Sequence, residues 1–208
     1  MRLEELSPFQ LDALREVGNI GAGHAATALS QLMGRPVGLS NPTLEIIPFG
    51  DVPNAIGGPE KLVGAVYSRL LGDIAGGILF MAERDSSLAL IDLMHNRPVG
   101  VTKSFGHSEE ALITHIASIL AAAYVAAIAR LADLNVLPAT PAFALDMAGA
   151  ILQVATTEVG MKAESALLVR TTFGDGDDTW GERPVDVMLF FLPNPDSLEV
   201  ILGRLGAA

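Results

Sequence analysis

The sequence predicts an α/β protein in which two pseudo-symmetric helix–strand–hairpin–helix repeats form one mostly antiparallel or mixed sheet faced by helices. Two observations support this prediction. First, 50% of the 208 residues are hydrophobic, so the chain can bury a substantial core. Second, the same order of elements occurs twice at nearly constant spacing. We therefore expect a single domain over 1–208, with repeat one at about 8–98 and repeat two at about 107–206.

Each repeat begins with a long helix. The sequence predicts helices over 11–33 and over about 110–132, which lie 99 positions apart. Ser7 followed by Pro8 is typical of a helix start, with a serine as N-cap and a proline at the first helical position.

A Pro-marked extended segment follows each helix, over 38–47 and 136–145, and a predicted β-hairpin comes next. The first hairpin is 62–83, where Leu-Gly-Asp supplies the turn. The second is 166–193, and its end matches the first at an offset of 110 rather than 99. The difference implies an 11-residue insertion, which we place in the acidic, Gly-rich hairpin tip.

A short helix closes each repeat, over 86–95 and 196–205. The stretch 96–109 between the repeats has no Pro/Ser-rich linker character, so we interpret it as a crossover within one domain. Helices and strands repeated in this way favour one sheet around a pseudo-two-fold axis.

Charge and composition exclude several classes of partner. A net charge of −11 argues against nucleic acid and anionic membrane surfaces, since both require clustered Lys and Arg. The most apolar stretch, 116–131, is interrupted by polar residues and is short for a bilayer crossing, so we predict a buried helix and no membrane insertion. The absence of cysteine fits a reducing compartment, and we expect a cytoplasmic protein.

Three polar residues on the first helix form the candidate site. At 100° per residue, Asp12, Glu16 and Asn19 fall within an arc of about 60°. The opposite side carries an aliphatic stripe followed by small residues that allow close packing against another element: Leu11, Leu14, Val17, Gly18, Gly21, Ala25 and Ala28. The helix therefore presents two carboxylates and one amide to solvent over roughly 10 Å.

The corresponding positions of the second helix differ in kind. They are Ala111, His115 and Ser118, which offer neither carboxylate nor amide. We expect this half to be catalytically silent and to serve for packing or partner docking. His115, on a long apolar helix, is expected to be a core or interface residue rather than a catalyst.

The first helix resembles the first active helix of the CheC family of chemotaxis phosphatases, within the CheC/CheX/FliY superfamily. The family pattern is Asp or Ser, then Glu four positions on and Asn three further, before an IGAG-N-AATALS run. Asp12, Glu16 and Asn19 match it, and 20–30 continues the run with His24 in place of the usual Asn. The resemblance extends through 48–60 and covers nearly the whole chain. The second helix departs from the family's frequent two-site pattern, so the chain resembles a single-site member.

The resemblance implies hydrolysis of the aspartyl phosphate on a CheY-type response regulator in chemotaxis signalling. It assigns catalytic roles to Glu16, Asn19 and Asp12. Asn19 can orient a water, Glu16 can pair with a regulator lysine, and Asp12 supports Glu16 or the docking surface. The protein needs no cofactor of its own, and Mg²⁺ is expected on the partner regulator.

A non-catalytic alternative remains open. The same resemblance allows an adaptor that binds a response regulator or a CheD-type deamidase. Intact Glu16 and Asn19 favour the enzyme, whereas the altered second helix and His24 favour the adaptor.

GNIGAG, at 18–23, is not a phosphate-binding loop, because it lies within a helix-compatible stretch rather than between a strand and a helix.

Overall fold

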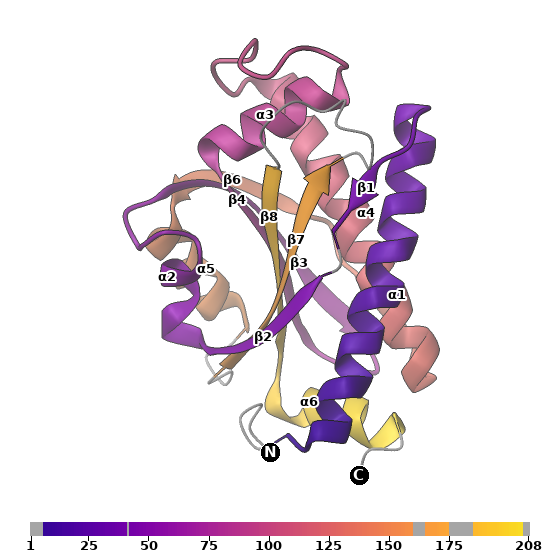
Figure 1. Cartoon of the computed structure of the whole chain (residues 1–208). Helices are drawn as coiled ribbons and strands as arrows, with labels where there is room; N and C mark the ends of the chain where they lie inside the picture. The colour runs from indigo at the N-terminus through magenta and orange to yellow at the C-terminus, as the bar shows by residue number, and fades with distance from the viewer. Residues whose placement is uncertain (1–5, 41, 160–164, 175–184, 206–208) are drawn as a thin grey trace.

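The computed structural model describes residues 6–40, 42–159, 165–174 and 185–205 (Figure 1). Within them, the predicted single sheet faced by helices is present, and the helices cover both of its faces. The helices are α1 (Pro8–Met33), the 3-10 turn η2 (Phe49–Asp51), α2 (Val52–Ala55), α3 (Arg84–Met94), α4 (His107–Ala132), α5 (Ala148–Val159) and α6 (Pro195–Arg204). Helices α1, α3, α4 and α6 pack on one face of the sheet, and α2 and α5 pack on the other.

Within the described residues, the sheet has eight strands in the order β1-β7-β8-β4-β3-β5, with β2 also paired to β7 and β6 also paired to β3. Every pairing among the described strands is antiparallel, so the sheet takes the antiparallel form of the two predicted. The strands are β1 (Gly38–Leu39), β2 (Thr43–Pro48), β3 (Leu62–Gly72), β4 (Gly76–Glu83), β5 (Val136–Pro138), β6 (Ala142–Met147), β7 (Ser165–Gly174) and β8 (Val185–Pro193).

The two halves of the chain exchange strands. Strand β2, from the first half, pairs with β7 of the second half from Thr43↔Arg170 to Pro48↔Ser165. Strand β6, from the second half, pairs in turn with β3 of the first. The hairpins β3–β4 and β7–β8 meet at the centre, where Leu79 lies opposite Phe190. The sequence does not reveal this exchange, because strand periodicity fixes which face is buried and not which strand is the neighbour.

Alternation along the strands produces two hydrophobic cores. On β4, Ile78 and Phe80 face the four-helix side, whereas Leu79 and Met81 face α2 and α5. All four are at most 2% exposed. The larger core contains the inner faces of α1 and α4, which lie side by side against the sheet (Figure 1).

Most predicted elements are found close to their expected positions. Both extended segments, the first hairpin and the closing helices are present. Helix α5, over a stretch with no predicted helix, is an addition, as is the short α2. The proposed insertion in the second hairpin falls almost entirely at 175–184, outside the described residues.

Helix α1 is capped at both ends. The Ser7 hydroxyl accepts a hydrogen bond from the Gln10 backbone N–H at 3.3 Å, and the Gln10 side chain accepts one from the Ser7 N–H at 2.8 Å. This is the reciprocal capping box that satisfies two donors at a helix start. Gly34, at φ 65°, closes the other end in the left-handed conformation.

Helix α4 is long and apolar enough to cross a membrane by length and composition, with a mean hydropathy of 2.0 over its most apolar window. In the fold it packs against α1 and the sheet, with Ile113, Ile116 and Leu120 at most 1% exposed. Half of its most apolar window is buried inside the protein.

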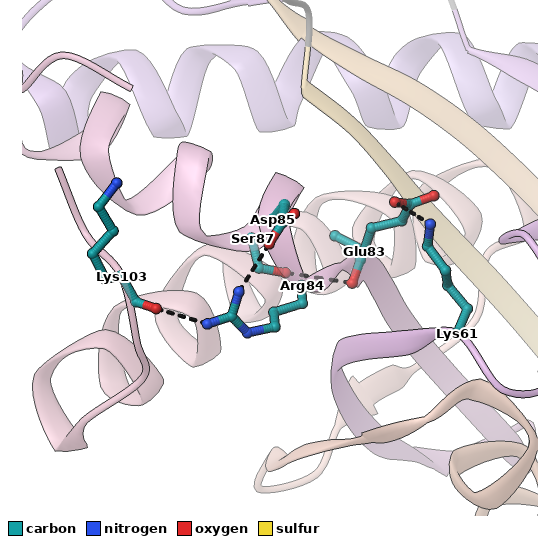
Figure 2. A network of polar contacts seen from close by, with 7 residues as sticks. Lys61, Glu83, Arg84, Asp85, Ser87 and Lys103 are labelled. Carbon is teal, nitrogen blue, oxygen red and sulfur yellow. Dashed lines mark hydrogen bonds and ion pairs between the residues drawn. The ribbon is translucent and has the colours of Figure 1, made fainter. Parts of the chain in front are cut away.

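Charged residues fasten the junction between β4 and α3 (Figure 2). One guanidinium nitrogen of Arg84 lies 2.9 Å from Asp85, and the other donates to the Lys103 carbonyl at 2.7 Å. Lys61 Nζ lies 2.8 Å from Glu83. The contact with Lys103 ties the connection between α3 and α4 to the start of α3.

Candidate functional site

The outer face of α1 carries the predicted site residues. Asp12, Glu16 and Asn19 are all exposed, and the helix places them along one face over about 10 Å. Asp12 Oδ1 forms an ion pair with Arg15 Nη1 at 2.7 Å. The side chain of Asp12 is 69% exposed and that of Arg15 is 59% exposed. A pair this exposed contributes little to stability. Glu16 and Asn19 are therefore open to a partner, and Asp12 lies at the edge of the group.

The inner face of α1 is fixed by close packing. Leu14 and Val17 are 3% and 5% exposed in the larger core. Gly18 and Gly21 are also buried, which confirms the predicted small-residue contact. A Cβ on Gly21 would lie 2.5 Å from Cδ1 of Tyr124, so α4 approaches α1 to a distance that only glycine permits there.

Tyr124 is the α4 residue on which this approach depends. It is 3% exposed, and burial raises the pKa of its hydroxyl to about 12. Its hydroxyl oxygen is buried and has no hydrogen-bond partner in the described part of the chain. The ring thus serves as a packing surface for α1, and the hydroxyl stays protonated at neutral pH.

Asn19 opens onto a shallow groove between α1 and the segment that follows it. The groove has a volume of about 310 Å³. Among the residues that the structure describes, its lining contains no charged side chain and consists of Asn19, Ala22, Gly23, Ala26, Leu39, Ser40 and Pro42. A binding partner that reaches Asn19 would also meet this uncharged surface.

The groove and Gly23 were not singled out as functional features in the sequence. One signal was available: Gly23 lies one helical turn beyond Asn19, and an exposed glycine in a helix interior is unfavourable. The rest could not be predicted, because Ser40 is held at the groove by hydrogen bonds to Thr172 of β7, more than 130 residues away.

The second helix presents a different surface at the equivalent positions. Ala111 and His115 are exposed, so the core position is wrong for His115, and the interface position that was predicted as its alternative stays a prediction. Ser118 is half-buried, and its hydroxyl donates to the Thr114 carbonyl at 2.6 Å. That hydrogen bond turns Ser118 back onto its own helix.

The chemistry available on α1 is that of a carboxylate and an amide. Among the described residues, no group of three or more His, Cys, Asp or Glu is placed to hold a metal ion. An amide can donate to and accept from one water molecule, and a carboxylate can accept from a cationic partner. The face is suited to orienting water against an electrophile that another molecule supplies.

Comparison with known proteins agrees with the motif and the fold. A model of the CheC-like family matches residues 9–46. The chain is 31% identical over 201 residues to the CheY-P phosphatase CheC of Bacillus subtilis (strain 168), covering 96% of this chain and 95% of that protein.

Two solved structures share the fold. FliY from Thermotoga maritima superposes with a TM-score of 0.77 at 16% identity, covering 97% of this chain and 98% of that one. The FliM middle domain from H. pylori superposes with a TM-score of 0.64 at 14% identity, covering 96% and 99%. With a relative above 30% identity along nearly its whole length, this chain belongs to the CheC-like family.

Proposed function

We propose that the protein is a phosphatase that hydrolyses the aspartyl phosphate of a CheY-type response regulator. Water attacks phosphorus, the bond from phosphorus to the carboxylate oxygen breaks, and the products are the free aspartate and inorganic phosphate. The observation that carries this proposal is the exposure of Glu16 and Asn19 on one face of a helix whose other face is fixed against α4.

Asn19 acts on the attacking water. Its side-chain oxygen accepts a hydrogen bond from water and its amide nitrogen can donate one, so it can aim the water along the line of the bond that breaks. An acyl phosphate is already reactive, and phosphoryl transfer depends mainly on positioning and electrostatics. A neutral amide approaches anionic phosphoryl oxygens at lower electrostatic cost than a carboxylate.

Glu16 fixes the register of the complex. A bare carboxylate is repelled by phosphoryl oxygens, so it is better placed against a regulator lysine. Asp12, one turn earlier and paired with Arg15, supports this docking contact at the rim. The roles differ, because Asn19 contributes to the chemical step and Glu16 contributes to binding.

The regulator supplies the positive charge that compensates the negative phosphoryl group. We assign Mg²⁺ to the partner regulator and no cofactor to this chain. The reaction takes place in the cytoplasm, and a CheD-type deamidase is a further candidate partner that the assay should include.

The experiment is the decay of ³²P-labelled aspartyl phosphate on the cognate regulator. We expect wild type to accelerate decay and Asn19→Ala to lower the maximal rate about 100-fold, as for loss of one oriented hydrogen-bonding group. Glu16→Ala should chiefly raise the regulator concentration needed for half-maximal rate. Gln31→Ala, an exposed change on another side of α1, is the matched control and should behave as wild type.

A folded wild-type protein that fails to accelerate decay, with or without a CheD-type partner, would refute the phosphatase proposal. Binding to the regulator without turnover would then identify the protein as an adaptor. Acceleration that survives Asn19→Ala would place the chemistry away from α1.

A further inference from the structure

Within the described part of the chain, no packing contact requires glycine at position 23. Gly23 is exposed in the interior of α1, and a Cβ built there meets no described atom within 4 Å. The fold would therefore accept a side chain, and glycine is the less favourable residue within a helix. Gly21 is the opposite case, since its Cβ would collide with the Tyr124 ring.

Gly23 lies next to the proposed chemistry. Four residues along a helix correspond to about 40° of rotation and about 6 Å of rise, so Gly23 continues the face that carries Asn19. Both residues line the same groove of about 310 Å³. A larger side chain at 23 would project into the space beside the Asn19 amide.

The far wall of the groove is held in place. The Ser40 N–H donates to the Thr172 carbonyl at 2.9 Å, and the Ser40 hydroxyl accepts from the Thr172 N–H at 3.0 Å. Thr171 donates its hydroxyl to the Ser40 carbonyl at 3.3 Å. These contacts bind Ser40, one residue of that wall, to β7.

We infer that Gly23 keeps open a docking groove for an uncharged loop of the phosphorylated regulator, bordering the aspartate that carries the phosphoryl group. This inference rests on the proposed function. A water held by Asn19 can reach phosphorus only if the regulator surface lies within a few ångströms of α1, which brings the neighbouring loop over Gly23. An uncharged lining accepts an uncharged segment without leaving a buried charge unpaired.

Gly23→Leu tests the groove, and Gly23→Ala gives a graded version. Gly203→Leu is the matched control, because Gly203 is an exposed glycine of α6 whose Cβ also meets nothing within 4 Å. Each variant is measured for its thermal unfolding midpoint, for kcat and KM, and for affinity toward the regulator activated with beryllofluoride.

We expect Gly23→Leu to unfold at or above the wild-type midpoint, while its KM and its Kd for the activated regulator rise at least about tenfold. Gly23→Ala should show a smaller rise in both. Gly203→Leu should also unfold at or above the wild-type midpoint, and it should match wild type in kcat, KM and Kd. Asn19→Ala should differ from Gly23→Leu by losing kcat with little change in Kd.

A Gly23→Leu variant that keeps wild-type KM and Kd would overturn the inference, and so would one that unfolds at a lower temperature. These outcomes are separate from failure of the proposed function, because Kd is measured without turnover. An inactive wild type that still binds the regulator would refute catalysis. The groove would then be tested by comparing the Kd of Gly23→Leu with that of wild type.

Discussion

Asp92 shows how one residue can order a long connection. It is fully buried near the end of α3, and its carboxylate accepts hydrogen bonds from the backbone N–H groups of Gly100, Val101 and Thr102 and from the Thr102 hydroxyl. Burial alone would raise the pKa of Asp92, but these donors outweigh it and hold the pKa below its ordinary value of 3.8.

This arrangement predicts a pH-dependent contribution to stability. Because the folded-state pKa is depressed, the contribution is present above pH 3.8 and is lost as the pH falls through the folded-state value. Asp92→Asn should lower the free energy of unfolding at neutral pH by about 2 kcal/mol, since the loop donors lose a charged acceptor. Urea unfolding at a series of pH values measures the difference, which should shrink as the pH falls below 3.8. A difference that stays constant with pH would contradict this account.

At the scale of elements, the contact between α1 and α4 depends on the pairing of Gly21 with Tyr124. Gly21→Ala places a Cβ 2.5 Å from the Tyr124 ring and should destabilise the protein by about 1–3 kcal/mol. Tyr124→Phe removes a buried hydroxyl that lacks a partner among the described residues, and should raise the free energy of unfolding by about 1 kcal/mol. Chemical denaturation measures both.

The double variant Gly21→Ala/Tyr124→Ala provides the control for direct contact. If the two residues collide, the second change relieves the first, and the combined loss is smaller than the sum of the single losses. Additive losses would show that Gly21 is required for a reason other than the Tyr124 ring.

The sequence predicted the helices and strands better than it predicted which of them pack against each other. The spacing of Leu14, Val17, Gly18 and Gly21 was sufficient to define the inner face of α1, and Ser7 was sufficient to define its start. Local pattern carries that information, because a helix places residues by rotation alone. The identity of the packing partner depends on contacts more than 100 residues away, which no local pattern encodes.

The candidate site divides in the same way. Asp12, Glu16 and Asn19 share a face because of helical spacing, and the structure has all three exposed there. The groove beside Asn19 needs Ser40, which β7 holds in place from the other half of the chain. Its existence follows from tertiary structure and could not be predicted from the helix.

At the scale of the whole molecule, the halves depend on each other for sheet pairing. Strand β2 finds its partner in β7, and β6 finds its partner in β3. Each half alone would leave strands unpaired, and unpaired strand edges are a liability in isolated fragments.

A chain divided within the α3–α4 connection tests this dependence. We expect the two fragments, when produced together, to assemble into a one-to-one complex that unfolds cooperatively. Neither fragment should fold alone as a monomer, since its exchanged strand has no partner. Circular dichroism and analytical ultracentrifugation measure both properties. A single fragment that unfolds cooperatively as a monomer would contradict the prediction.

The exchange of strands also determines how late in synthesis the functional surface of α1 is completed. Helix α1 is made first, yet its inner face packs in a core that includes residues of β7, β8 and α6. The groove beside Asn19 needs β7 as well, so a nascent chain emerging from the ribosome carries the complete motif without a usable surface. Contacts this distant in sequence form late, so apolar segments stay exposed until the strands that cover them have been synthesised. A truncated product lacking the last strands would expose those segments to chaperones and proteases before it could meet a regulator.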